Sequence, residues 1–136
     1  MKPSLTPGVG TTRRFTIDRD RTIGFMGEDA RVYSTPSLIL DIESACRDLL
    51  LEHLDPGEDS VGTRVEVDHL APTLLGMAVD ITVTIAEVKG RLVTLDVSGR
   101  DPVEEIARGR HVRFIAAVAK TKERLAAKRA KAAPPP

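Results

Sequence analysis

The sequence contains no tryptophan and a single cysteine in 136 residues. One cysteine excludes an internal disulfide framework and a zinc site built from several cysteines. No apolar run approaches the ~18–20 residues that a membrane-spanning helix requires, and the first residues lack the apolar stretch of a secretory signal. These absences favour a soluble, cytoplasmic protein that does not act at a membrane.

An excess of charge of one sign is also missing, because 20 basic residues balance 20 acidic ones. The bulk composition therefore gives no case for a nucleic-acid partner. The balance hides an asymmetry, since residues 120–136 carry six Lys or Arg and one Glu, whereas the preceding 119 residues carry 14 basic and 19 acidic side chains. This basic, Ala-rich end predicts a fraying helix that runs into a disordered tail. The alternative is an arm that binds phosphates.

Length and composition indicate one domain. With 136 residues, of which 41% are apolar, the chain can enclose one core but not two. Residues 1–11 hold two Pro and two Gly and predict a loose leader, so the expected domain spans 12–119 and the tail 120–136. Residues 19–34 show no clear period and predict a loop or lid with at most a turn of helix.

The segment from Thr35 to Leu54 predicts the one long helix of the domain. Thr35 is expected to cap it, Pro36 suits the first turn, and Gly57 follows just past its end. Its apolar residues recur at spacings of three and four, and the stripe they form is broad enough to be buried on more than one side: Leu38, Ile39, Ile42, Ala45, Cys46, Leu49, Leu50 and Leu54.

Alternating apolar residues predict strands on both sides of that helix. The Lys89-Gly90 pair is typical of a hairpin turn, and Asp101-Pro102 is typical of another. One helix followed by long antiparallel strands indicates an α+β domain in which a sheet curls around its helix. The expected strands are a short one over 13–18 and longer ones over 64–70, 79–85, 91–97 and 103–119.

Glu43 is the first candidate for chemistry. Its helical neighbours Ile39, Cys46 and Leu50 share its stripe, so a carboxylate projects from a largely apolar face. Burying a carboxylate is unfavourable unless it is hydrogen-bonded, which makes this position unusual. The alternative is a position at the edge of the stripe, where Glu43 reaches water beside Arg47.

His69 is the second candidate. In the segment RVEVDHL, the residues Val65, Val67 and His69 alternate onto one face and are expected to point inward. A lone inward histidine is also common as a hydrogen-bonded core residue, so both interpretations stay open. An inward histidine together with an inward glutamate from the neighbouring helix is the less common combination.

Thr35 and Gly62 are candidates of a weaker kind. The Thr35 hydroxyl can cap the helix and line the mouth of a site at the same time, and Gly62 either lets a backbone N–H approach a ligand or simply forms a turn. The three histidines lie on separate expected elements without metal-ligand spacing, and Cys46 is expected to be an inert core thiol. No metal and no cofactor is therefore expected.

At these residues the chain resembles a known family. Four segments carry the resemblance: TPSLILDIESAC from Thr35, LDPGEDSVGT, VDHLAPTLLGM, and GRLVTLDVSGRDPVEEIARGRH. They resemble the hotdog-fold acyl-CoA thioesterases of the fluoroacetyl-CoA thioesterase family. The similarity runs from about Thr35 to Phe114, and the helix Glu, the strand His and the preceding Thr fall at the spacing of the family.

The resemblance implies an α+β hotdog fold, a long helix wrapped by an antiparallel sheet, over residues 12–119. It implies a homodimer with sites at the subunit interface, with Thr35, Glu43 and His69 as catalytic residues and Gly62 as the substrate-binding loop glycine. The implied reaction is hydrolysis of a small acyl-CoA thioester to the free acid and CoA, with coenzyme A as part of the substrate. The alternative function is a non-catalytic hotdog module that binds acyl-CoA or acyl-carrier thioesters.

Overall fold

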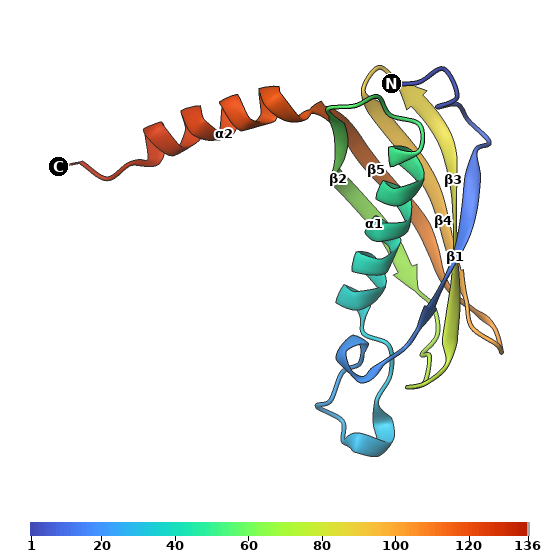
Figure 1. Cartoon of the computed structure of the whole chain (residues 1–136). Coiled ribbons are helices and arrows are strands. Elements are labelled where there is room, and N and C mark those ends of the chain that lie inside the picture. The colour runs from blue at the N-terminus through green and yellow to red at the C-terminus, as the bar shows by residue number, and fades with distance from the viewer. Residues whose placement is uncertain (136) are drawn as a thin grey trace.

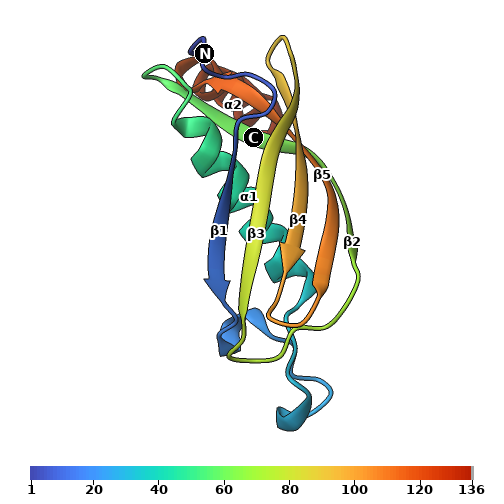
Figure 2. The same ribbon diagram turned by 90° about the vertical axis from the view of Figure 1, so that its right-hand side faces the viewer.

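A five-stranded antiparallel sheet curls around one long helix in the computed structural model, which describes residues 1–135 (Figures 1 and 2). The strand order is β1-β3-β4-β5-β2, and α1 lies against one face of the sheet. This arrangement confirms the predicted α+β class. The elements are β1 (Gly10–Thr16), α1 (Thr35–Leu51), β2 (Glu58–His69), β3 (Ala78–Lys89), β4 (Leu92–Arg100), β5 (Glu105–Ala117) and α2 (Val118–Ala132), with short 3-10 turns at Arg19–Arg21 and Glu28–Ala30.

Helix α1 begins where predicted, but its cap is a different residue. Ser34 is the N-cap, and its hydroxyl accepts a hydrogen bond from the Ser37 N–H at 3.2 Å. The prediction of Thr35 as the cap was wrong, because the chain enters the helix one residue earlier and both side chains are cap formers. The Thr35 hydroxyl is therefore free for another partner. The helix also ends at Leu51, three residues before the predicted end.

The core lies between α1 and the inner face of the sheet. Each inner strand alternates buried apolar residues with outward polar ones, as the period of two requires. The β3–β4 hairpin turns at Gly90, whose φ of +60° explains the glycine. The largest buried group comprises Leu38, Ile42, Leu49 and Leu50 from α1 and Val79, Ile81, Val83, Ile85, Val93, Leu95, Ile106 and Ile115 from the sheet.

Strand β2 forms one edge of the sheet and pairs with β5 alone. It begins six residues before the predicted strand, and a bulge interrupts its pairing between Gly62 and Arg64. Residues 61–66 are exposed. Val65, which was expected to point inward, is 38% exposed because no further strand covers this edge. A long, partly apolar edge of this kind is a template for pairing with another chain.

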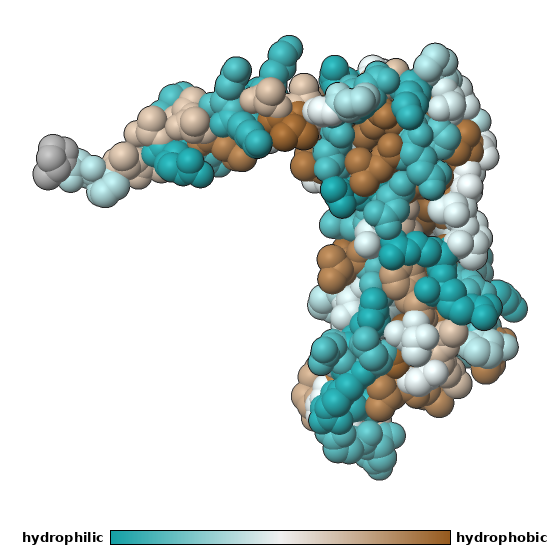
Figure 3. Space-filling model, in the orientation of Figure 1, coloured by the Kyte–Doolittle hydropathy of each residue, from teal (hydrophilic) through white to brown (hydrophobic). Residues whose placement is uncertain are grey.

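Helix α2 continues directly from β5 and extends past the β2 edge, clear of the sheet (Figure 1). None of its residues is buried, and hydrophilic side chains cover much of its surface (Figure 3). The helix predicted at the start of the basic tail extends as far as Ala132, because Ala, Lys and Arg are strong helix formers. Pro136, the last residue of the predicted tail, lies outside the described residues. No helix within residues 1–135 is long and apolar enough to cross a membrane.

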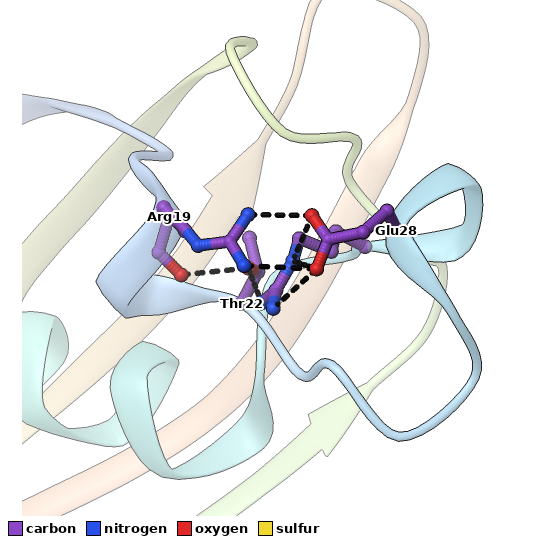
Figure 4. A network of polar contacts seen from close by, with 4 residues as sticks. Arg19, Thr22 and Glu28 are labelled. Carbon is purple, nitrogen blue, oxygen red and sulfur yellow. Dashed lines mark hydrogen bonds and ion pairs between the residues drawn. The ribbon is translucent and has the colours of Figure 1, made fainter.

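The segment between β1 and α1 forms a lid-like excursion at the end of the sheet where α1 begins. Ion pairs hold it in shape: the Arg19 guanidinium donates to both Glu28 carboxylate oxygens at 2.5 and 2.8 Å, and Arg31 donates to Glu28 and to the Thr22 hydroxyl (Figure 4). These two arginines lower the Glu28 pKa to about 2. The predicted loop with a turn of helix is confirmed as two 3-10 turns.

Candidate active site

The structure brings together two of the predicted site residues, Thr35 and His69. Thr35 is the first residue of α1 and His69 is the last residue of β2, and Thr35 Oγ1 lies 2.8 Å from His69 Nδ1 in a hydrogen bond. Because Ser34 caps the helix, the threonine hydroxyl is available for this contact. The bond fixes which nitrogen of the imidazole faces α1.

The other imidazole nitrogen is buried, in a residue that lines a hollow. His69 Nε2 is buried and has no hydrogen-bond partner among the described residues. Thr35 and His69 line a cavity of about 430 Å³, together with the lid-like segment and the residues that follow β2. Burial lowers the pKa of His69 below its ordinary value of 6.5, so the ring is neutral at neutral pH. A neutral imidazole with a free nitrogen can take or return a proton. The remaining lining is mostly apolar: Ile23, Phe25, Val32, Tyr33, Ser34, Pro36, Leu70, Ala71 and Pro72.

Glu43 does not join this pair within one chain. Eight residues separate it from Thr35, which places it about 12 Å farther along the helix axis at 1.5 Å per residue. Its neighbour in β2 is Gly62, where an added Cβ would lie 3.3 Å from Glu43 Oε1. Gly62 and His69 are seven residues apart, about 23 Å along an extended strand. The chain therefore holds two half-sites: Thr35 with His69, and Glu43 with Gly62.

A buried arginine and a buried histidine lie beside the Glu43 half-site. Arg113 Nε donates to Ser60 Oγ at 2.7 Å, Nη2 donates to the Ser60 carbonyl at 2.7 Å, and Nη1 donates to His111 Nε2 at 3.0 Å. Because an arginine N–H only donates, His111 Nε2 accepts, and its Nδ1–H donates to the Arg64 carbonyl at 2.8 Å. His111 is therefore held neutral in one tautomer.

Arg113 brings a positive charge near the Glu43 carboxylate, and the neutral His111 ring lies beside it. Burial lowers the pKa of the Arg113 guanidinium, and the charge of Glu43 opposes that shift. Burial also lowers the pKa of His111. The hydrogen bond to the Arg64 carbonyl and the charge of Glu43 act in the opposite direction and reduce this shift. Glu43 is half-buried, and Arg47, the residue expected beside it, is bonded to Asp59 at 2.7 and 3.0 Å.

Sequence reasoning did not select His111 and Arg113 as site residues. A signal was present, because both share with Ile115 the alternate positions of a strand that point toward the core. Cys46 is fully buried near them, and burial raises its pKa to about 12, which agrees with the predicted inert thiol.

Other concave or ligand-like features lie away from these residues. A hollow of about 490 Å³ lies on the outer, polar face of the sheet, where Asp96, Arg108 and Arg110 contribute to its walls, and it includes none of the predicted site residues. In residues 1–135, no group of three or more His, Cys, Asp or Glu side chains is arranged to hold a metal ion.

Comparison with known proteins identifies the family. The profile of the fluoroacetyl-CoA-specific thioesterases matches residues 17–119. The chain belongs to the fluoroacetyl-CoA-specific thioesterase family. The fluoroacetyl-CoA thioesterase of Streptantibioticus cattleyicolor is 31% identical over 122 residues, which cover 85% of this chain and 88% of that protein.

Solved structures confirm the hotdog fold. A structure of the fluoroacetyl-CoA thioesterase matches with a TM-score of 0.83 and 28% identity, covering 92% of this chain and 98% of that one. A thioesterase superfamily member from Thermus thermophilus matches with a TM-score of 0.84 and 26% identity over 96% and 99% of the two chains. A hot-dog-like protein from Thermanaerovibrio acidaminovorans matches with a TM-score of 0.83 and 26% identity over 93% of each chain.

Proposed function

We propose that this protein hydrolyses an acyl-CoA thioester with a small acyl group to the free acid and CoA. The observation that carries the proposal is the Thr35–His69 hydrogen bond, which leaves the second imidazole nitrogen buried and unpartnered in a residue that lines a cavity of about 430 Å³. Family membership supports it, as does a variant of the fluoroacetyl-CoA-specific thioesterase that was solved in complex with fluoroacetate and CoA and is 30% identical to this chain.

The complete site is proposed to form between two copies of the chain. An antiparallel pairing of two β2 edges about a two-fold axis near Val65 would bring His69 of the partner subunit opposite the stretch from Ser60 to Gly62. The Glu43 half-site of one copy would then face the Thr35–His69 half-site of the other. Two observations support this pairing: the exposed, unpaired edge at 61–66, and the separation of Glu43 from His69 within one chain.

In this composite site each residue has a defined task. The Glu43 carboxylate attacks the thioester carbonyl carbon to give an acyl anhydride and a thiolate, or it removes a proton from the attacking water. His69, oriented by the Thr35 hydroxyl, activates the water that completes hydrolysis. The Gly62 N–H is the candidate donor to the oxyanion. Arg113 supplies a buried positive charge beside the Glu43 carboxylate, and His111 holds the Arg113 guanidinium in place.

Release of free thiol from a panel of acyl-CoAs tests the activity directly. The panel includes acetyl-, fluoroacetyl-, propionyl- and longer acyl-CoAs, followed with a thiol-reactive dye. We expect turnover of small acyl groups by the wild type. Acyl-CoA binding without thiol release would instead support the non-catalytic module, and turnover only of acyl-carrier thioesters would replace CoA by a carrier protein.

Mixing two inactive variants tests the shared site. In a mixed dimer of Glu43→Ala and His69→Ala chains, one composite site loses both residues and the other keeps both. Random exchange of subunits would then restore about a quarter of wild-type activity. Light scattering on the same samples should give twice the chain mass. Absence of any recovery in samples that contain mixed dimers would contradict the shared site.

A further inference from the structure

Behind the His69 hollow, a buried tyrosine and a buried aspartate form a polar pair that the proposed reaction does not use. Tyr33 is 2% exposed and Asp41 is 4% exposed, and the Tyr33 hydroxyl donates to Asp41 Oδ2 at 2.6 Å. Arg21 completes the group, with Nε donating to Asp41 Oδ2 at 2.9 Å and Nη2 donating to Oδ1 at 3.2 Å. A carboxylate buried in α1 therefore has three donors and its counter-ion.

Tyr33 connects this group to the histidine. Its ring lies against the His69 ring in a T-shaped contact, with centroids 6.2 Å apart and planes at 81°. Its backbone N–H donates to the Thr73 carbonyl at 2.8 Å, and the next residue, Ser34, donates to the Arg21 carbonyl at 2.8 Å. The tyrosine is thus fixed at its hydroxyl, its ring and its backbone.

The Tyr33 contact restrains the His69 ring beyond the Thr35 bond. A hydrogen bond at Nδ1 tolerates a range of distances and angles, so the side-chain torsions of His69 can still shift the ring while the bond is kept. A rigid aromatic ring against its side limits this motion, and T-shaped pairs are favourable in themselves. The position of Nε2 therefore depends on both neighbours.

We propose that Tyr33, held by Asp41 and Arg21, is a positioning residue for His69. Tyr33 fixes the plane of the imidazole, Asp41 fixes the tyrosine, and Arg21 links both to the lid-like segment. The inference rests on the proposed hydrolysis for its effect on turnover, while its effect on His69 can be measured without any turnover. Burial and Asp41 both raise the Tyr33 pKa well above its ordinary value, so its hydroxyl remains a donor to Asp41 and is not a proton source for substrate.

Three substitutions separate the parts of this arrangement. Tyr33→Leu removes the ring, Tyr33→Phe keeps the ring and removes the hydroxyl, and Asp41→Asn keeps the size and removes the charge. We expect kcat to fall by about tenfold or more in Tyr33→Leu and by about threefold in the other two, with KM within about twofold, because small displacements of a reacting group lower the rate strongly. Partial rescue by phenylalanine identifies the ring as the main contact.

NMR titration of the His69 imidazole, assigned with His69→Ala, provides the second readout. Tyr33 and His69 are the titratable residues in the lining of the hollow. Leucine at position 33 admits water beside the ring, so the His69 pKa should rise toward 6.5 in Tyr33→Leu. The matched control is Leu49→Ala, which opens a cavity in the core at the other end of α1. It should lower Tm without moving the His69 titration.

The two proposals fail in different ways. If the wild type hydrolyses thioesters and Tyr33→Leu changes neither the His69 titration nor kcat, the positioning role is wrong. It is also wrong if Leu49→Ala gives the same changes. If no thioester is hydrolysed but Tyr33→Leu shifts the His69 titration, the positioning role holds and the proposed hydrolysis fails. Should Tyr33→Leu not fold, an unchanged kcat in both Tyr33→Phe and Asp41→Asn would overturn the proposal.

Discussion

Gly62 lies directly against the side chain of Glu43. A Cβ at position 62 would stand 3.3 Å from Glu43 Oε1 and 3.1 Å from Cε1 of the His111 ring. The φ angle of Gly62 is outside the left-handed region, so its backbone does not require glycine. The requirement comes from the two side chains, because a methyl group at position 62 would need Glu43 or His111 to shift by a few tenths of an ångström.

Gly62→Ala should therefore lower kcat/KM, because the methyl group must push Glu43 or His111 out of place. We expect a loss of about tenfold, with a small decrease in Tm. The control is Thr63→Ala at the adjacent exposed residue of the bulge, which should leave the kinetics unchanged. Normal kcat/KM in a folded Gly62→Ala protein would contradict the contact between Gly62 and the reacting carboxylate.

Removing either proposed reacting group should abolish most of the turnover. Glu43→Ala and His69→Ala are each expected to lower kcat by on the order of 10²-fold or more while the protein stays folded. Thr35→Val should have a smaller effect, and Thr35→Ser should restore it, since serine keeps the hydroxyl bonded to His69 Nδ1. If the residues were structural, Tm would fall first and activity would follow only the folded fraction.

The pH dependence follows from two buried histidines. Burial lowers the pKa values of His69 and His111 below 6.5. Just below pH 6.5, both side chains are therefore still neutral in the folded protein, whereas they begin to take up protons in the unfolded chain. The stability that this provides is complete above pH 6.5 and is lost as the pH falls through the folded pKa values. Both kcat/KM and Tm should therefore fall on the acidic side. A Tm profile of His111→Gln that shows the same acidic loss would remove His111 from this account.

Deleting residues 120–136 should leave Tm and KM nearly unchanged. Helix α2 buries none of its residues, and the bond from the Val118 N–H to the Gly57 carbonyl at 2.9 Å is retained in the shortened chain. The competing outcome is a KM that rises several-fold and becomes salt-sensitive, because Lys120, Lys122 and Arg124 would then contact the phosphates of CoA. Kinetics of the shortened chain at two salt concentrations decide between them.

The sequence predicted the helix and the inward histidine because both follow from local periodicity. Leu38, Ile42 and Leu49 define one face of α1 whatever surrounds it. The cap was assigned one residue late because Ser34 and Thr35 have the same capping chemistry, and only the path of the chain into the helix distinguishes them.

The division into half-sites was not visible in the residue pattern. Glu43 and His69 both point inward. The periodicity of a strand or a helix predicts which face a side chain lies on, but it does not predict how far apart two such side chains lie along the strand and the helix. Arg113 was missed for a related reason, because a charged residue at a core position is assigned to the surface unless its partners are known. Those partners are His111 and both the hydroxyl and carbonyl of Ser60, which come together only through the pairing of β2 with β5.

The bulge in β2 lets Gly62 and His69 face the same side of the sheet. The two residues are seven positions apart, and an odd separation in a regular strand would place them on opposite faces. Because the bulge adds one residue between Gly62 and Arg64, Ser60 and Gly62 point toward the helix before it, and Val67 and His69 do so after it. Deleting Thr63 would leave a regular strand in which Gly62 and His69 keep these faces, since Gly62 and Arg64 already pair with the consecutive residues Arg113 and Val112. Homologues that carry this site should therefore have either six residues and a bulge between the two positions or five residues and no bulge.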